Sequence, residues 1–547
     1  MFDTSLWTSL LLVGAVLFLG KYVYGRRALS TLHNIPGPPS SSFWIGNLGQ
    51  YFSRQGSEFQ RHVAQDYGSV TKIHGRFGSP VLYVSDPKAL HTIVIKEEHI
   101  FQNPTATLSF RQMMFGPGLL STQGEKHRKQ RKLLNPAFSI NHMRYMLPIF
   151  YHVVHKLRVA IDRQVSDGPQ EIDILNWMGR TALELIGQGG LGYSFDPLVE
   201  DVQNDYGDAL KNLLPNLGKV LPMVRFVLPL IARFSPAKLG RSVIDRVPHG
   251  EVQAVKTIID TMDRRSRAIY ESKKAALRAG DEAVLQQMGE GKDIMSILIR
   301  ANSTTSVDDR LRDDELIAQM STFVFAATDT TSNTLARILQ SLAEHPEVQD
   351  KLRAELLDAD AGGSLSYDEL DQLPFLDSVC RETLRLYPPV RALSRTANHD
   401  TVLPLSEPIV GIDGILIREI PIPKGTTVMI GVLGCNTSKK IWGEDADEWK
   451  PERWLSPLPG TVTKDTIPGV YSNLMTFIGG RRACIGFKFS EMEMKVVLSV
   501  LLTSFTFSLS DKPIEWNVAG VRYPTVGKEG KTPQMPLKVG SLRGAKI

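Results

Sequence analysis

Residues 477–486 read Phe-Ile-Gly-Gly-Arg-Arg-Ala-Cys-Ile-Gly, a glycine-rich stretch that carries one of only three cysteines in a chain of 547 residues. An apolar-periodic segment follows from Phe487 to Leu501, and its pattern predicts a buried helix. Cys484 would then lie just before the helix N-terminus, where backbone N–H groups and the helix dipole favour an ionised thiol. The sequence therefore makes Cys484 a candidate thiolate ligand for a metal.

The residues around Cys484 fit a haem better than any other partner of a thiolate. Gly480 and Gly486 allow the backbone to approach a flat macrocycle closely. Phe477 can pack on such a macrocycle, and Arg482 can pair with one of its propionates. A buried, unreactive cysteine in a glycine-rich turn is the competing interpretation of the loop taken alone.

Composition narrows the class of protein. Hydrophobic residues make up 42% of the chain and charged residues 22%, which is typical of a globular protein with ample core material. The net charge of +5 comes from scattered Lys and Arg residues, so nucleic-acid binding is not indicated. The cysteines Cys380, Cys435 and Cys484 form no Cys-x-x-Cys pair, which argues against a zinc site and a disulfide framework and fits a reducing compartment.

The N-terminal region predicts a membrane anchor. Residues 6–19 are apolar and uncharged, and the apolar run continues past Lys21 if that side chain reaches the headgroup region. A run of about twenty such residues can cross a bilayer. Arg26 and Arg27 follow it, which orients the rest of the chain towards the cytosol. A cleaved signal peptide is the competing interpretation, but no Ala-x-Ala-like site follows the apolar core.

The following segments predict a hinge and a globular domain. The Pro-rich segment 35–40 predicts a stiff hinge, because proline fixes φ and removes an N–H donor. Residues 70–73 and 81–84 alternate around a glycine-rich turn and predict a β-hairpin. Residues 251–279 have a helical pattern, and a mixed, polar stretch follows them. Segment 213–234 is broken by prolines but strongly apolar, which predicts either a flap that dips into the bilayer beside a substrate entrance or simple core packing.

A long helix is predicted from Asp314 to His345. Its middle, residues 323–332, is apolar on every face and then abruptly polar. A helix that is apolar all round is buried, so Asp329 and Thr330 require a functional reason to be there. The competing interpretation is that these two residues cap a break between two helices.

Three further motifs are rich in charge. Glu382 and Arg385 lie at i and i+3 of a predicted helix, a spacing that is common in surface ion pairs. The sequence Pro-Glu-Arg-Trp follows at residues 451–454. The basic segment 124–132 is, taken alone, typical of a solvated helix face.

Taken in order, these motifs resemble those of the cytochrome P450 family, and with the N-terminal run the resemblance covers nearly the whole chain. The spacing Phe-x-x-Gly-x-Arg-x-Cys-x-Gly resembles the family's haem-binding loop. Residues 326–331 resemble its Ala-Gly-x-Asp-Thr-Thr motif, with Ala327 in place of the usual Gly. The basic segment resembles the family's Trp-x-x-x-Arg helix with His127 in place of Trp, and Trp454 stands where the family usually has Phe.

The resemblance implies a fold that is mainly α-helical with small β-sheets, the cytochrome P450 fold, preceded by a single N-terminal transmembrane helix. We expect a membrane anchor at residues 1–24, a Pro-rich hinge at 25–40 and a haem-thiolate catalytic domain at 41–547. The Glu-x-x-Arg and Pro-Glu-Arg-Trp motifs then form a buried ion network behind the loop, which consists of Glu382, Arg385 and Arg453.

The resemblance also implies a role for the residues around haem b. Cys484 is expected to be the axial ligand of the iron, while Thr330 supplies a hydroxyl and Asp329 relays protons on the opposite face of the haem. Either Arg391 or Arg395 can hold a propionate, and we favour Arg395. The residues expected to bind the cofactor are Cys484, Phe477, Gly480, Arg482, Gly486, Arg131, His127 and Arg395.

The expected activity is monooxygenation of a lipophilic molecule such as a terpenoid, sterol or fatty acid in secondary metabolism. Electrons are expected from NADPH through a flavoprotein reductase, and the expected location is the endoplasmic reticulum membrane, single-pass, with a cytosolic catalytic domain. Basic residues predicted to dock an acidic flavoprotein are Lys126, Arg128, Lys129, Lys132 and Lys488. The Asp-Thr pair argues against two alternatives, a haem-thiolate isomerase or dehydratase and a haem-binding membrane protein without turnover.

Two N-glycosylation sequons offer a test of topology. They begin at Asn302 and Asn436, in a polar stretch and a loop that are both predicted to be exposed. A cytosolic domain would leave both residues unmodified, whereas a glycan on either would contradict the predicted orientation.

Overall fold

The structure of the protein is a computed structural model. It describes residues 32–542 except 197, 199–212, 214–215, 218–219, 221–243, 281, 284–289 and 465–466. The predicted anchor at residues 1–24 and most of segment 213–234 lie outside the described residues. No helix within the described ranges is long and apolar enough to cross a bilayer.

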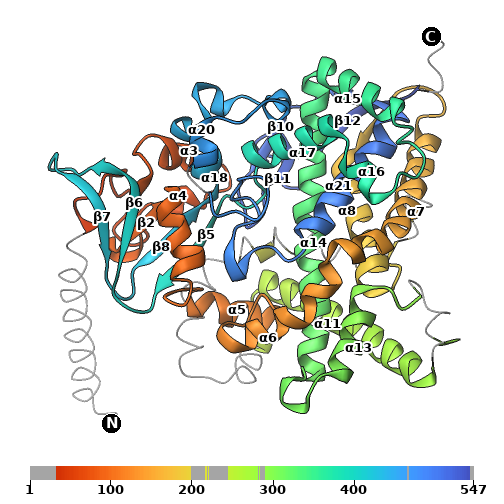
Figure 1. Ribbon diagram of the computed structural model, residues 1–547, viewed down its shortest axis with the longest axis horizontal. Coiled ribbons are helices and arrows are strands. Elements are labelled where there is room, and N and C mark those ends of the chain that lie inside the picture. Colours follow the sequence, from red (N-terminus) through yellow and green to blue (C-terminus); the bar gives the residue numbers. More distant parts are fainter. Residues whose placement is uncertain are drawn as a thin grey trace.

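The described part of the chain is mainly helical, with small β-sheets (Figure 1), as the sequence predicts. The helices are α2 (Leu48–Tyr51), α3 (Ser57–Gln65), α4 (Pro87–His91), α5 (Thr105–Phe115), α6 (Gly124–Leu134), α7 (Ile140–Gln164), α8 (Ile174–Leu185), α11 (Gly250–Ala279), α13 (Ile294–Thr304), α14 (Asp313–Glu344), α15 (Pro346–Asp358), α16 (Tyr367–Asp371), α17 (Pro374–Leu386), α18 (Val432–Asn436), α19 (Lys439–Trp442), α20 (Gly460–Lys464) and α21 (Phe487–Leu502). The strands are β1 (Val70–His74), β2 (Pro80–Val84), β3 (Phe101–Gln102), β4 (Gln170–Asp173), β5 (Ala392–Ala397), β6 (Thr401–Val410), β7 (Leu416–Ile422), β8 (Thr427–Gly431), β9 (Phe505–Leu509), β10 (Ile514–Asn517), β11 (Tyr523–Val526) and β12 (Pro536–Ser541).

Helix α14 runs through the middle of the molecule and contacts α8, α11, α17 and α21 (Figure 1). Its first turn carries three acidic residues beginning at Asp313, which complement the positive end of the helix dipole. Pro346 ends it, because the residue before a proline is disfavoured in the α conformation. The prediction of one unbroken helix is therefore confirmed, with both ends one residue earlier than expected.

The strands form one five-stranded sheet and smaller ones. The sheet order is β1-β2-β8-β5-β3, and it lies at one end of the molecule, away from α7 (Figure 1). The predicted hairpin is confirmed as β1 and β2, which pair antiparallel with Val70 opposite Val84. The Pro-rich hinge is tied to this sheet, because Lys72 donates its backbone N–H to the carbonyl of Pro36 over 2.8 Å.

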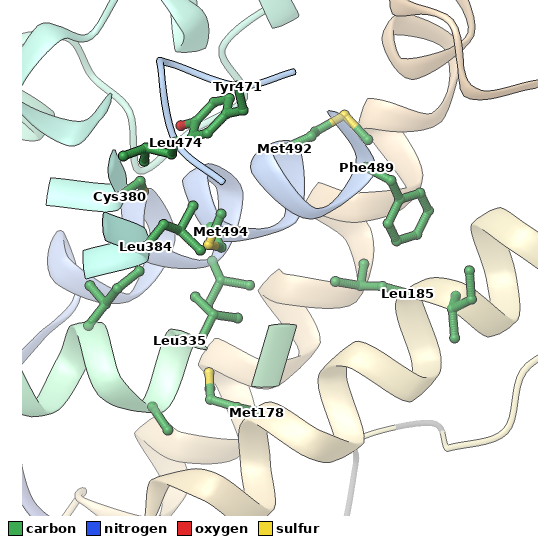
Figure 2. Close-up of a cluster of buried hydrophobic side chains, with 14 of the residues drawn as sticks. Met178, Leu185, Leu335, Cys380, Leu384, Tyr471, Leu474, Phe489, Met492 and Met494 are labelled. Carbon is green, nitrogen blue, oxygen red and sulfur yellow. The ribbon is translucent and has the colours of Figure 1, made fainter. Parts of the chain in front are cut away.

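A buried apolar cluster holds the helices together beside the glycine-rich loop (Figure 2). Helix α21 contributes Phe489 and Met494, α8 contributes Met178, and α14 contributes Leu335. Each such side chain contributes roughly 1.5–3 kcal/mol when fully buried. The start of α21, and the loop before it, is therefore fixed by packing against the helices that surround it.

The structure corrects two expectations about polar segments. The stretch after α11 contains a further helix, α13, which the sequence analysis missed. Both sequon asparagines are buried: Asn302 donates to the carbonyl of Leu311, and Asn436 donates to the Thr476 hydroxyl. The prediction that they are exposed is wrong, so the absence of a glycan at these residues would report their burial and not the topology.

Candidate active site

The loop before α21 is closed by its own backbone. The N–H of Cys484 donates to the carbonyl of Phe477 over 2.9 Å, and the Phe477 ring contacts those of Tyr471 and Phe487 edge-on or tilted. Gly480 has φ +69°, and a Cβ atom there would lie 1.9 Å from the carbonyl oxygen of Val94. Glycine is thus required at residue 480 for a close approach of two backbones. The requirement for glycine therefore comes from the backbone at Val94 and not, as the sequence predicted, from close approach to a macrocycle.

Cys484 is exposed, whereas Cys380 and Cys435 are buried. The surrounding protein nevertheless raises the pKa of the Cys484 thiol, with burial as the largest cause, opposed by the backbone N–H of Gly486 and the charge of Arg131. The Cys484 thiol is thus accessible to a ligand although protein surrounds it. A metal cation bound there would reverse the direction of the pKa shift and hold the thiolate.

The middle of α14 has accessible surface although the helix runs through the core. Ala326 is exposed, and Asp329 and Thr330 are half-buried. The Thr330 hydroxyl donates to the carbonyl of Ala326 over 2.8 Å. One residue further, the hydroxyl of Thr331 lies 3.1 Å from that of Ser490 in the first turn of α21, which ties the two helices together beside Cys484.

Burial raises the pKa of Asp329 to about 7. Within the described residues its carboxyl group has no hydrogen bond or ion pair. A carboxyl group with a pKa near neutral holds a proton part of the time, so it can both donate and accept one. Asp329 can therefore act as a proton relay.

Four guanidinium groups lie near the loop. Arg131 donates to the carbonyl of Ala483 over 2.6 Å, and Arg482 donates to that of Thr122 over 2.7 Å. Arg395 donates to the side chain of Asn103 over 3.0 Å. Their acceptors are neutral groups. The fourth member of the group is Arg111 of α5, which donates to the carbonyl of Leu120.

The charges of these arginines are poorly compensated. The pKa of Arg395 and that of Arg482 are each lowered to about 10, mainly by burial. Arg111 adds repulsion at both residues, and Glu98 is the one carboxylate that opposes these shifts within the described ranges. Buried positive charges of this kind require further anionic partners. The two propionates of a haem would supply them.

His127 is buried on α6, one turn before Arg131. The pKa of its imidazole is lowered to about 3 by burial and by the charges of Arg482 and Arg131. The ring is neutral near pH 7 and keeps one N–H to donate, so it meets the requirement for replacing the indole of the family's usual Trp. The residues present thus fit a haem.

The structure separates Arg391 from this group. Arg391 donates to the side chain of Gln60 on α3 over 3.2 Å, whereas Arg395 lies with Arg482 and Arg111. The sequence motifs did not indicate Arg111 or Glu98, because neither belongs to a recognisable pattern.

Behind the loop, Glu382 and Arg385 of α17 are completely buried and joined by two contacts of 2.8 Å. Arg453 approaches the same carboxylate at 3.4 Å, and the indole N–H of Trp454 donates to it over 3.0 Å. Arg385 also donates to the backbone carbonyls of Asn436, Ala446 and Glu448. The predicted three-residue network is therefore present, and it fixes the backbone that leads to the loop.

A cofactor that is flat, takes a thiolate ligand and carries two carboxylates satisfies both the thiol and the arginine group, and haem b meets these conditions. The fold and the site together define a haem-thiolate protein. Comparison with known proteins agrees: residues 36–519 match the family model described as Cytochrome P450. The chain belongs to the cytochrome P450 family.

The most similar proteins found are fungal. The chain is 62% identical over 533 residues to cytochrome P450 monooxygenase 81 of Postia placenta, with 97% of each chain covered. It is 49% identical over 519 residues to a ganoderic acid synthetase of Ganoderma lucidum, with 94% of each chain covered. A cytochrome P450 monooxygenase of Hericium erinaceus is 40% identical over 536 residues, with 96% of each chain covered. The chain is accordingly a P450 monooxygenase, an enzyme that binds haem b through a cysteine thiolate.

Proposed function

We propose that this enzyme inserts one oxygen atom from O2 into a lipophilic small molecule, a terpenoid, sterol or fatty acid, in secondary metabolite biosynthesis. Cys484 would hold the haem through its thiolate, and electrons would come from NADPH through a flavoprotein reductase. The proposal rests on one observation. The Cys484 thiol is accessible, and so is the segment of α14 that holds Asp329 and Thr330. Similarity to a protein named for ganoderic acid supports the secondary-metabolite setting.

The chain's own residues have separate tasks in this reaction. Bound haem supplies O2 activation at an iron whose thiolate ligand donates electron density. Asp329 and Thr330 move and position protons, since one has a pKa near neutral and the other a hydroxyl in the same turn of α14. Phe325, Ala326 and Ala327 present apolar surface beside them, which supports a lipophilic substrate.

The proposal is tested by adding NADPH and a flavoprotein reductase to the purified holoenzyme. A panel of terpenoids, sterols and fatty acids is first screened for displacement of the haem-bound water, seen as a change in the haem absorbance spectrum. Substrates that bind should accelerate NADPH oxidation and gain one oxygen atom from O2. Conversion of a substrate without reductase or O2 would instead identify an isomerase or dehydratase.

Replacing Thr330 with alanine is expected to uncouple the reaction. Haem and substrate should still bind, because the variant loses one hydroxyl that makes only a local hydrogen bond. Product formed per NADPH should fall about 100-fold, at the lower end of the effect of a positioned proton donor. Thr334→Ala is the matched control, since Thr334 makes the same kind of bond one turn later, to the carbonyl of Thr330. Equal coupling in both variants would reassign Thr330 to helix packing.

Electron delivery is proposed to occur on the face that carries α6. Lys126, Arg128 and Lys132 are exposed on this helix, and the neighbouring Arg131 reaches the carbonyl just before Cys484. Lys129 and Lys488 are half-buried. Exposed positive charges next to the thiolate side of the haem support docking of an acidic reductase, chiefly by accelerating association at low salt.

Membrane association is proposed through residues 1–24, with the catalytic domain in the cytosol and the protein in the endoplasmic reticulum. Exposed apolar side chains support a membrane-facing side. Phe43 and Trp44 follow the hinge, and an apolar patch at the tip of the β6/β7 hairpin consists of Val410, Ile412, Ile415 and Leu416; each of these six side chains is between 57% and 67% exposed. The tip of the β6/β7 hairpin is joined to the hinge, because Ile412 donates its N–H to the carbonyl of Asn34 over 2.8 Å. The patch thus lies where the chain arrives from the predicted anchor.

A label at Ile412 should report contact with lipid. In the holoenzyme Cys484 is proposed to be held by iron and the other cysteines are buried, so Ile412→Cys can be labelled selectively with an environment-sensitive fluorophore. In phosphatidylcholine vesicles its emission should shift to the blue and be quenched by spin-labelled lipid. Leu357→Cys, 55% exposed on α15, which lies away from β7 at the top of Figure 1, is the control and should stay in water. Equal emission at both sites in vesicle-bound protein would contradict the membrane-facing side while leaving the anchor in place.

A further inference from the structure

A second group of arginines, one of them buried (Arg391) and two half-buried, lies apart from the one that faces the haem. It consists of Arg337 on α14, Arg391 before β5 and Arg522 between β10 and β11. Arg391 donates to the side chain of Gln60, and Arg337 donates to the side chain of Gln340 over 3.0 Å. These acceptors, like those of Arg522, are neutral.

The positive charges of this group repel one another. The pKa of Arg391 is lowered to about 10, first by burial and then by neighbouring arginines that include Arg337. The pKa of Arg522 is also lowered, first by burial and then by Arg391 and Arg337. Arg337 forms an ion pair with Glu344 at 3.9 Å, whereas Arg391 and Arg522 have no ion pair within the described part of the chain. Buried charge without a counter-charge is strongly unfavourable, so an anionic partner is missing.

The buried hydrogen-bond donors of this arginine group that have no acceptor in the described part of the chain are its Nε–H groups. Within the described ranges, the Nε–H groups of all three arginines are buried and have no hydrogen-bond acceptor. A guanidinium group binds a carboxylate or phosphate most strongly when Nε and a terminal nitrogen both donate to it. The unpaired Nε–H groups are therefore the donors that such a ligand would use.

Two of the three arginines, Arg522 and Arg391, contact the N-terminus of a helix. Arg522 donates to the Ser57 hydroxyl over 3.2 Å, and Arg391 approaches the carbonyl of the same residue at 3.5 Å. Ser57 is the first residue of α3, a nine-residue helix whose N-terminus has no side-chain cap. The positive end of the helix dipole thus adds to the arginine charges, and the first-turn carboxylate, Glu58, is exposed. Positive groups from three separate segments meet at one point, which favours an anion there.

Haem does not account for this group. The arginines that shift the pKa of Arg395 are Arg482 and Arg111, whereas those that shift Arg391 are Arg61 and Arg337. The two groups are therefore electrostatically separate, and the propionates that satisfy the first leave the second unpaired.

We propose that Arg391, Arg522 and Arg337 form an oxyanion-binding site at the N-terminus of α3, which takes the carboxylate or phosphate group of a small molecule. The guanidinium carbon of Arg337 lies 3.8 Å from the ring centroid of Tyr387, so an aromatic face borders the site. Arg337 also follows Thr330 by seven residues on the same face of α14, about 10 Å along the helix. A carboxylate at one end of a lipophilic acid could reach the site while the other end lies beside Thr330.

The test measures the thermal midpoint at which the holoenzyme loses its haem absorbance, at constant ionic strength. Inorganic phosphate and decanoate are titrated separately. We expect at least one of them to raise the midpoint in a saturable way, since a ligand of the folded state stabilises it. Arg391→Gln and Arg522→Gln should each abolish the rise, and Arg265→Gln, a change of an exposed arginine on α11, should preserve it.

The outcomes also identify the source of the anion. A rise with phosphate shows that a free oxyanion occupies the site. A rise with decanoate alone, accompanied by displacement of the haem-bound water, shows that the site holds the carboxylate of a substrate. If Arg522→Gln does not fold, the titrations of Arg391→Gln and of the wild type decide whether an anion binds at this site. No saturable rise in the wild type, or an equal rise in the Arg391 variant, overturns the proposal, and neither result bears on the monooxygenase activity.

Discussion

Cys484→Ser is expected to abolish thiolate ligation and with it the monooxygenase activity. A serine hydroxyl does not ionise near neutral pH, so the backbone N–H of Gly486 and the charge of Arg131, which favour the thiolate, have no anion to stabilise. The measurement is the carbon-monoxide spectrum of the reduced protein, in which the band characteristic of a thiolate-ligated haem should be absent. Product formation in the presence of reductase should fall below detection.

The same substitution at a second cysteine controls for a general effect on folding. Cys435 on α18 is completely buried and remote in the sequence from the loop. Cys435→Ser places a hydroxyl in the core and lowers stability modestly, but it should retain the thiolate-type band. A thiolate-type band that persists in Cys484→Ser would refute the assignment of the axial ligand, and the loop would then have to be interpreted as a structural turn.

Sequence patterns predicted the elements whose signals are local. The helix from Asp313 to Glu344 is predictable because it has acidic residues at its start, an apolar middle and a proline directly after its end. The β1/β2 hairpin is predictable because its two segments alternate around a glycine-rich turn. These features depend on backbone preferences and periodic burial, which a sequence records directly.

Contacts between distant segments were not predictable. Asn302 and Asn436 belong to polar sequences, yet each is buried because a backbone group elsewhere completes its hydrogen bonds. Trp454 departs from the family's usual Phe, and only the structure shows that its indole N–H donates to the carboxylate of Glu382. Arg111 belongs to no motif and becomes significant only through its proximity to Arg395 and Arg482.

The buried ion network behind the loop is a further set of contacts that the sequence could not predict. Two Glu-x-x-Arg pairs occur at identical spacing, Glu382 with Arg385 and Glu125 with Arg128. In the first pair both side chains are completely buried, whereas in the second the side chains are 87% and 67% exposed. Spacing alone cannot distinguish them. Their energies differ because water screens the exposed pair, and the buried one is stabilised only by its partners.

Glu382→Gln is therefore expected to destabilise the protein by about 3 to 5 kcal/mol, a large fraction of the ~5–15 kcal/mol that holds a typical domain folded. The substitution keeps the shape of the side chain but leaves Arg385 buried without its carboxylate, and Arg385 in turn holds the carbonyls that position the backbone before the Cys484 loop. The variant should lose haem at a denaturant concentration well below that of the wild type. Glu125→Gln, the matched change in the exposed pair, should alter stability by no more than about 0.5 kcal/mol. Equal denaturation midpoints for the two variants would mean that the network contributes no more than a surface ion pair.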